Sequence, residues 1–135
     1  MTNIFVSYKQ WWLEEFELNK NLGFLREKLE ELNYNNFIYY FDEEFKNISA
    51  EIINSNAINR IKKSDIVLWF INHKDKSEWQ LLELWIAYAM WKKIILLVNN
   101  KIKENYFLSF WLKAKIIYFN NLEEINFKEI WNIEK

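Results

Sequence analysis

The segment from Ser64 to Val98, "SDIVLWFINHKDKSEWQLLELWIAYAMWKKIILLV", decides the fold of this chain. It begins and ends with apolar runs, which predict strands at Asp65–Ile71 and Lys93–Val98. Runs without polar alternation are typical of strands whose two faces are both buried in a parallel sheet. A helix from about Glu78 to Met90 is expected between them. The segment therefore predicts one strand–helix–strand unit of an α/β protein.

The rest of the chain continues this alternation. Short β-rich runs predict three more strands, at Asn3–Ser7, Phe37–Phe41 and Lys115–Phe119. Leucines recur at helical spacing between positions 18 and 32, and Ser49 is expected to be the N-cap of a second helix. The expected helical stretches are 13–32, 50–63, a short irregular or helical stretch at 106–114, and a final short helix at 121–133.

Strands that alternate with helices, the central strands being continuously apolar, indicate a parallel sheet covered on both faces. Because crossovers between parallel strands are right-handed, the simplest topology is a flavodoxin-like doubly wound sheet. We predict a three-layer α/β/α fold with a five-stranded parallel sheet in the order 2-1-3-4-5, numbered along the chain. No linker, repeat or low-complexity stretch interrupts residues 1–135, so a single domain is expected.

Composition argues against several kinds of partner and site. A net charge of −1 in 135 residues gives no electrostatic reason to expect a nucleic acid or a membrane as partner. No apolar run reaches the ~18–20 residues that span a bilayer, and the first residues show no secretory signal, so a cytoplasmic protein is expected. With no cysteine and a single histidine, His73, we expect no disulfide and no metal site. We also expect no cofactor.

Tryptophan and glycine occur in unusual numbers. The chain has eight tryptophans and one glycine, whereas glycine normally supplies about 7% of residues. Trp85 and Trp91 stand where a short, tightly packed α/β unit would favour glycine. If both residues are native, overpacking at each site is expected to cost ~1–3 kcal/mol. Alternatively, UGA codons that some bacterial lineages read as glycine are represented here as tryptophan.

Ligands of doubly wound sheets bind outside the carboxyl ends of the strands, near the point where the strand order reverses. This rule predicts that the ligand binds to the segments that follow the first three strands, namely 7–12, 42–45 and 72–83. Ser7 and Tyr8 lie in the first of them, where backbone N–H groups can hold a ribose or a phosphate. We expect both residues to bind substrate.

Glu83 is the candidate catalytic residue. If Ser77 is the N-cap, Glu83 lies in the second turn of its helix, at the end that points toward the ligand cleft. Apolar neighbours such as Leu82 and Leu84 would partly desolvate the carboxylate and make it a nucleophile or a tunable base. The alternative is a solvated glutamate on the outer face of the helix.

The segment Ser64–Val98 resembles the core of the nucleoside 2-deoxyribosyltransferase family. There, a strand that begins with aspartate is followed by an acidic loop, a Glu-Leu-Gly sequence, a Gly-Lys pair and a buried strand. With glycine in place of tryptophan, the helix here would read "SEG…ELG.AYAMGKK", which fits that pattern better. Residues 108–112 and 122–127 are similar to the closing segments of the family.

This resemblance implies a function for Glu83. The matching glutamate of the family attacks the anomeric carbon of a nucleoside, and a second base or water then resolves the covalent deoxyribosyl-enzyme, as in a retaining glycosidase. Two family aspartates that handle the base fall on Ala57 and Ser77, which is a departure from the pattern. The residues that can substitute for them are Tyr8, Asp42, Asp75 and Glu78. A neighbouring subunit usually completes such sites, through a segment that here includes Lys115, so a homo-oligomer is expected.

A second resemblance is to TIR domains. The stretches "IFVSYK", "YYFDEEFKNIS" and "KSEWQLLEL" are similar to their boxes, and on this reading Trp79 is genuine. In NAD-cleaving members, the glutamate matching Glu83 breaks the nicotinamide–ribose bond. The alternative function is therefore a TIR-like protein that cleaves NAD or serves as a non-catalytic signalling module. The expected partner is a nucleoside, a nucleotide or NAD.

Overall fold

Five parallel strands form one sheet in the order β2-β1-β3-β4-β5, as the sequence predicted. The computed structural model describes residues 2–8, 15–38, 41, 50–71, 78–101 and 115–130. Its strands are β1 (Asn3–Ser7), β2 (Asn35–Phe37), β3 (Ile66–Ile71), β4 (Lys93–Asn99) and β5 (Lys115–Phe119). Its helical elements are α1 (Glu15–Glu31), α2 (Ala50–Lys63), α3 (Glu78–Ala89), the 3₁₀ turn η5 (Leu122–Glu124) and α5 (Phe127–Ile130).

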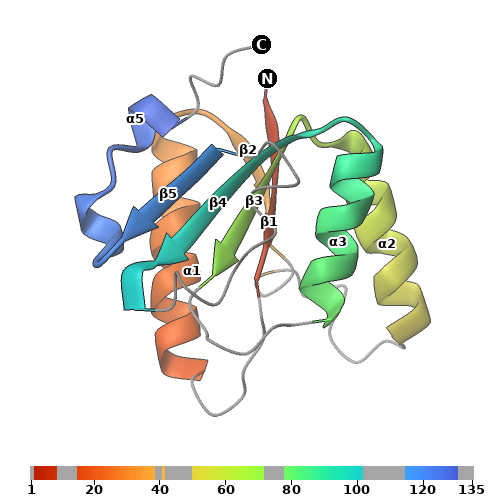
Figure 1. Cartoon of the computed structure of the whole chain (residues 1–135), viewed down its shortest axis with the longest axis horizontal. Coiled ribbons are helices and arrows are strands. Elements are labelled where there is room, and N and C mark those ends of the chain that lie inside the picture. Colours follow the sequence, from red (N-terminus) through yellow and green to blue (C-terminus); the bar gives the residue numbers. More distant parts are fainter. Residues whose placement is uncertain are drawn as a thin grey trace.

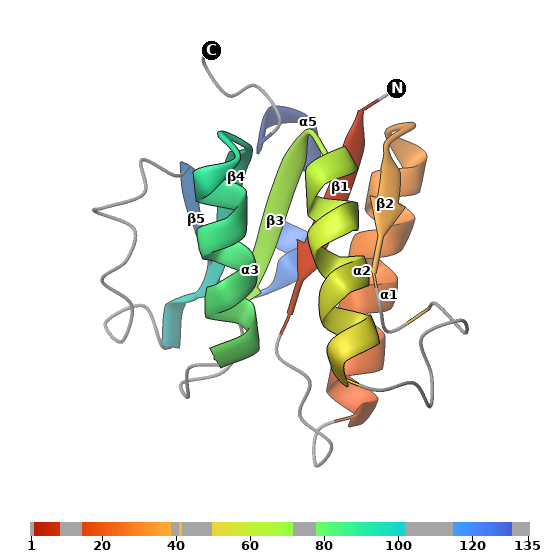
Figure 2. The same cartoon turned by 90° about the vertical axis from the view of Figure 1, so that its right-hand side faces the viewer.

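Helices cover both faces of the sheet, which gives the predicted three-layer α/β/α architecture (Figures 1 and 2). Helices α2 and α3 lie side by side on one face, while α1 and α5 lie on the other. Side chains alternate along each strand. In β1, Ile4 and Val6 pack in the core under α1, and Phe5 packs in the core under α2 and α3. Every residue of β3 is buried, as its uninterrupted apolar run predicted.

The second strand begins and ends earlier than predicted. The apolar run starts at Phe37, but β2 pairs with β1 from Asn35 onward, in the register Asn3↔Asn35. The strand ends at Phe37, so Ile38 and Phe41, which were expected to belong to it, lie beyond its end. The Asn35 side-chain amide donates a hydrogen bond of 3.0 Å to the Asn3 side-chain carbonyl, so two polar residues mark the start of this edge strand. Residues 39 and 40 lie outside the described part of the chain.

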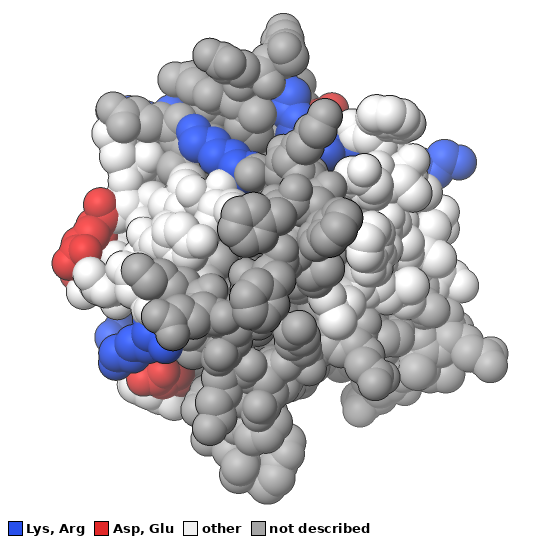
Figure 3. Space-filling view, in the orientation of Figure 1, with Lys and Arg blue, Asp and Glu red and all other residues white. Residues whose placement is uncertain are grey.

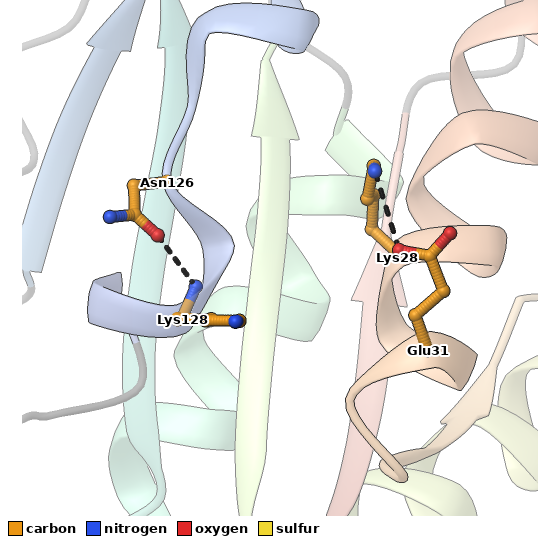
Figure 4. Close-up of polar contacts among 4 residues, drawn as sticks. All are labelled: Lys28, Glu31, Asn126 and Lys128. Carbon is orange, nitrogen blue, oxygen red and sulfur yellow. Dashed lines mark hydrogen bonds and ion pairs between the residues drawn. The ribbon is translucent and has the colours of Figure 1, made fainter.

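The predicted last helix is divided in two. Instead of one helix, the described residues from 121 to 130 form a 3₁₀ turn and a single helical turn, which are separated by Ile125 and Asn126. Residues 131–133 of the predicted helix lie outside the described part. The Asn126 side-chain carbonyl accepts a hydrogen bond of 3.2 Å from the Lys128 backbone N–H and starts the second turn (Figure 4). Asparagine side chains compete with helical backbone bonds in this way, which explains the break. The same view shows the Lys28–Glu31 pair of α1, at 3.3 Å.

Helices α1 and α3 end in the same geometry, with a non-glycine residue in the left-handed conformation. In α1, Asn33 has φ 62° and the Tyr34 N–H donates to the Leu29 carbonyl at 3.0 Å. In α3, Trp91 has φ 60° and the Lys92 N–H donates to the Ala87 carbonyl at 3.0 Å. This pattern is the Schellman motif, whose left-handed position is usually glycine or asparagine.

The described surface carries charges of both signs. On the face shown in Figure 3, lysines and arginines form small groups, and acidic residues lie apart from one another. Within the described ranges, no helix is both long enough and apolar enough to cross a membrane.

Candidate active site

Glu83 is buried at the carboxyl edge of the sheet. It lies in the second turn of α3, and its exposed fraction is only 4%. Its helical neighbours Leu84 and Ala87 pack against the sheet beneath α3. The alternative of a solvated glutamate on the outer helix face is therefore wrong.

Ser7 brings the end of β1 to this carboxyl group. It is the last residue of the strand, is 1% exposed, and lies on the same face of the sheet as Phe5, toward α3. Its Oγ donates a hydrogen bond of 2.8 Å to Glu83 Oε1. The two residues are 76 positions apart in sequence, so the fold joins two separately predicted candidates into one site.

Burial changes the proton affinity of Glu83. Desolvation raises the pKa of its carboxyl group from 4.5 to about 8, while the hydrogen bond from Ser7 acts in the opposite direction. Burial disfavours the charged form because low-dielectric surroundings solvate a carboxylate poorly. A carboxyl group in this state is neutral in most molecules at pH 7, and its basic form, once generated, is weakly solvated and reactive.

Gln80 is a buried polar residue of this site that sequence reasoning missed. It lies one turn before Glu83 on the same face of α3 and is 3% exposed. Its side-chain amide donates to the backbone carbonyls of Phe70, at 2.8 Å, and Ser7, at 3.2 Å. Its spacing of three residues from Glu83 places both side chains on one helix face, which was the available signal.

Among the described residues, none of the other predicted substrate-binding residues joins Ser7 and Glu83. Tyr8 is partly buried and packs against the core under α1, on the opposite side of the sheet from Glu83. The predicted residues Asp42, Asp75 and Ser77 lie outside the described residues, as does the side chain of Glu78. Ala57 is 1% exposed and packs in the core under α2 and α3.

Trp85, in α3, and Trp91, just after this helix, are not overpacked. Trp85 is 46% exposed, and its ring meets Tyr88 edge to face at 5.9 Å between centroids. Trp91 is 95% exposed. The expected crowding at these positions is therefore wrong, and the case for glycine at 91 comes instead from its positive φ.

The described residues contain no group of three potential metal ligands. They do form two open hollows away from Glu83. One, of about 480 Å³, lies between α1 and η5, with Phe24 and Leu122 in its wall. The other, of about 380 Å³, lies beside β5, with Lys115 and Tyr118 in its wall.

Neither a family model nor a curated protein matches this chain. Solved structures do. The CMP N-glycosidase BcmB of Clostridium botulinum aligns over 98% of this chain and 100% of its own, with 24% identity and a TM-score of 0.76. A 2-deoxyribosyltransferase from Bacillus psychrosaccharolyticus aligns over 98% and 93%, with 16% identity and a TM-score of 0.68. A conserved protein of Enterococcus faecalis V583 aligns over 74% and 65%, with 15% identity and a TM-score of 0.60.

The first resemblance found in the sequence is thus confirmed at the level of the fold. The chain folds like a CMP N-glycosidase and a 2-deoxyribosyltransferase, the first of which is 24% identical and aligned along its whole length. At such identities, this likeness establishes that the chain shares their fold.

Proposed function

We propose that this protein is an enzyme that cleaves or transfers the N-glycosidic bond of a nucleoside or nucleotide, with Glu83 as the nucleophile. The observation that carries the proposal is the buried Ser7–Glu83 pair, joined at 2.8 Å where the carboxyl ends of β1 and β3 meet α3. The strand order reverses between these two strands, which is where doubly wound sheets bind their ligands. The neighbours with the same fold support the choice of bond, because their names describe N-glycosidic cleavage and deoxyribosyl transfer.

In the proposed reaction, the ionised Glu83 carboxylate attacks the anomeric carbon of the bound nucleoside. The bond from that carbon to the base nitrogen breaks, and its electron pair leaves with the base, which takes up a proton. Water or a second base then attacks the same carbon and releases Glu83. The transition state has oxocarbenium character, and a carboxylate placed against the sugar stabilises its positive charge.

Ser7 and Glu83 have different roles in the proposed reaction. The Ser7 hydroxyl binds Oε1, which leaves Oε2 of Glu83 to form the bond to the sugar. This hydrogen bond also favours the charged carboxylate and so opposes the effect of burial. We propose Asp75 and Glu78 as the candidates for protonating the leaving base, and Asp42 and Ser77 as further substrate contacts.

Base release from three substrates tests the proposal. Purified protein is incubated separately with CMP, with a deoxynucleoside plus a free base, and with NAD, and the products are separated by chromatography. We expect base release from CMP or from the deoxynucleoside. Release from NAD alone would favour the TIR-like alternative, and no release from any substrate would favour an interaction module.

Two glutamate variants test the nucleophile. Glu83→Gln is expected to abolish turnover, whereas Glu30→Gln on the exposed face of α1 provides a matched control with wild-type turnover. Acid quenching during turnover, followed by peptide mass spectrometry, should find a pentosyl adduct on Glu83. Turnover that survives in Glu83→Gln would show that another group is the nucleophile.

We also propose that the protein is a homo-oligomer, because a neighbouring subunit completes the site in the family that the sequence resembles. Sedimentation equilibrium measures this directly. A monomer of 16.8 kDa at assay concentration would contradict the proposal.

A further inference from the structure

We propose that Gln80 is a positioning residue, which holds the end of β1 so that Ser7 keeps its hydroxyl on Glu83. This inference rests on the proposed function of Glu83. Gln80 itself touches neither reacting carboxylate oxygen in the described contacts. It acts through the backbone of Ser7.

The contacts of Gln80 lie at the point where β1 and β3 end. Ser7 is the last residue of β1, and it pairs with Trp69 in the register of the two strands. Phe70, the next residue of β3, lies beyond that last pair. The Gln80 amide group has two hydrogens, and it donates to the carbonyl of Ser7 at 3.2 Å and to that of Phe70 at 2.8 Å. One side chain therefore ties both strand ends to α3.

These bonds close a loop of contacts around Ser7. Its backbone carbonyl accepts from Gln80, and its side-chain hydroxyl donates to Glu83 one helical turn later. Both partners belong to α3, so Ser7 is held at two points by one rigid helix. Because all three residues are at most 4% exposed, water does not readily replace a lost bond.

The chemistry of the side chain explains why glutamine suits this position. Buried backbone carbonyls need donors, and a neutral amide provides two of them without adding charge next to a nucleophile. A lysine or arginine here would pair with Glu83 and hold its carboxylate in an ion pair. An aliphatic residue would leave both carbonyls without these donors.

The titration of Glu83 reports on the Ser7 hydroxyl, because this hydroxyl donates to its carboxyl group at 2.8 Å. Burial raises the pKa of Glu83, and the hydrogen bond from Ser7 lowers it. A displaced hydroxyl would therefore move the pKa of Glu83 further upward. A merely structural loss of packing would lower the melting temperature and leave this titration in place.

Gln80→Met tests the inference, because methionine has a similar length and no donor. Ile61→Met, at a buried apolar position of α2 in the same core, is the matched control. We expect Gln80→Met to lower kcat/KM about tenfold at pH 7, by no more than Ser7→Ala does, and to shift the acid limb of the pH profile to higher pH by about one unit. The Ile61→Met profile should remain at the wild-type position.

The Glu83 carboxyl carbon, followed by ¹³C NMR and assigned by its loss in Glu83→Gln, reports the same shift without any substrate. A double-mutant cycle then asks whether Gln80 acts through Ser7. In a Ser7→Ala background, Gln80→Met should no longer move the titration. If Gln80→Met fails to fold, Gln80→Asn, which is one methylene too short to reach both carbonyls, should give a smaller shift in the same direction.

The outcomes separate this inference from the proposed function. If a folded Gln80 variant leaves the Glu83 titration unchanged, or shifts it equally with and without the Ser7 hydroxyl, the positioning role is wrong. Either result can occur while turnover still depends on Glu83. Conversely, absence of turnover on every substrate would overturn the proposed function, even if the NMR cycle shows that Gln80 and Ser7 are coupled.

Discussion

Replacing Trp91 by glycine should stabilise the protein. Trp91 has φ 60°, and a side chain in the left-handed conformation costs roughly 1–2 kcal/mol. Glycine removes that cost, but its greater freedom in the unfolded chain destabilises the folded protein by about 0.5–1 kcal/mol. Because the indole is 95% exposed, its removal sacrifices little buried apolar surface. We expect the free energy of unfolding to rise by about 1 kcal/mol.

Thermal unfolding followed by circular dichroism measures this gain, which corresponds to a Tm increase of about 3–5 °C for a domain of this size. Trp91→Ala is the decisive control, because it removes the indole and keeps the unfavourable backbone conformation. Asn33→Gly, at the equivalent end of α1, should change Tm little, because asparagine tolerates this conformation. An unchanged or lower Tm in Trp91→Gly, or an equal gain in Trp91→Ala, would refute the reasoning.

Trp85 is expected to behave in the opposite way. It lies inside α3, where glycine costs about 1 kcal/mol, and its ring also contacts Tyr88. Trp85→Gly should therefore lower Tm. If Trp91→Gly stabilises the protein and Trp85→Gly does not, glycine is favoured only at the end of the helix. The codon in the gene would then show whether UGA specifies position 91.

Three further predictions concern Glu83, its partner and the single glycine. Between pH 4.5 and about 8, the folded protein holds a proton on Glu83 that the unfolded chain has lost, so the free energy of unfolding should fall by about 1.4 kcal/mol per pH unit. Glu83→Gln should abolish this slope in urea titrations and stabilise the protein at pH 7 by about 3 kcal/mol; an unaltered slope would assign it to other groups. Ser7→Ala should raise the pKa of Glu83, so the acid limb of the plot of kcat/KM against pH should move to a higher pH than the wild-type limb near pH 8. Acid limbs at the same pH in both proteins would contradict the contact. Gly23→Ala should raise the unfolding free energy by about 0.5–1 kcal/mol, because among the described residues the new Cβ would meet only Phe41, at 4.0 Å; a drop in Tm would show crowding there.

Much of the fold could be predicted because its signals are local. The apolar runs that form β3 and β4 are read directly from neighbouring residues, and every position of β3 is buried. Alternation of strands and helices then allows few topologies, and the simplest one is the observed order. The position of Glu83 near the carboxyl edge of the sheet follows from the same topology.

Other features depended on contacts that are distant in sequence. Asn35 begins β2 because it meets Asn3, and no apolar pattern marks that residue. Asp65, which opens the third predicted strand, accepts a hydrogen bond of 2.8 Å from the Asn3 backbone N–H. Both contacts form only after β1 has been placed between β2 and β3.

Hydrophobic periodicity is encoded locally, so the five-stranded α/β sheet and a glutamate near its ligand edge could be predicted from neighbouring residues. Only the folded chain shows that Glu83 turns inward, that Ser7 is its partner, and that Gln80 joins the strand ends. It also placed Trp91 in the left-handed conformation. The physical reason is that burial and hydrogen bonding belong to pairs of residues, and the chain must fold before residues 7 and 83 become neighbours.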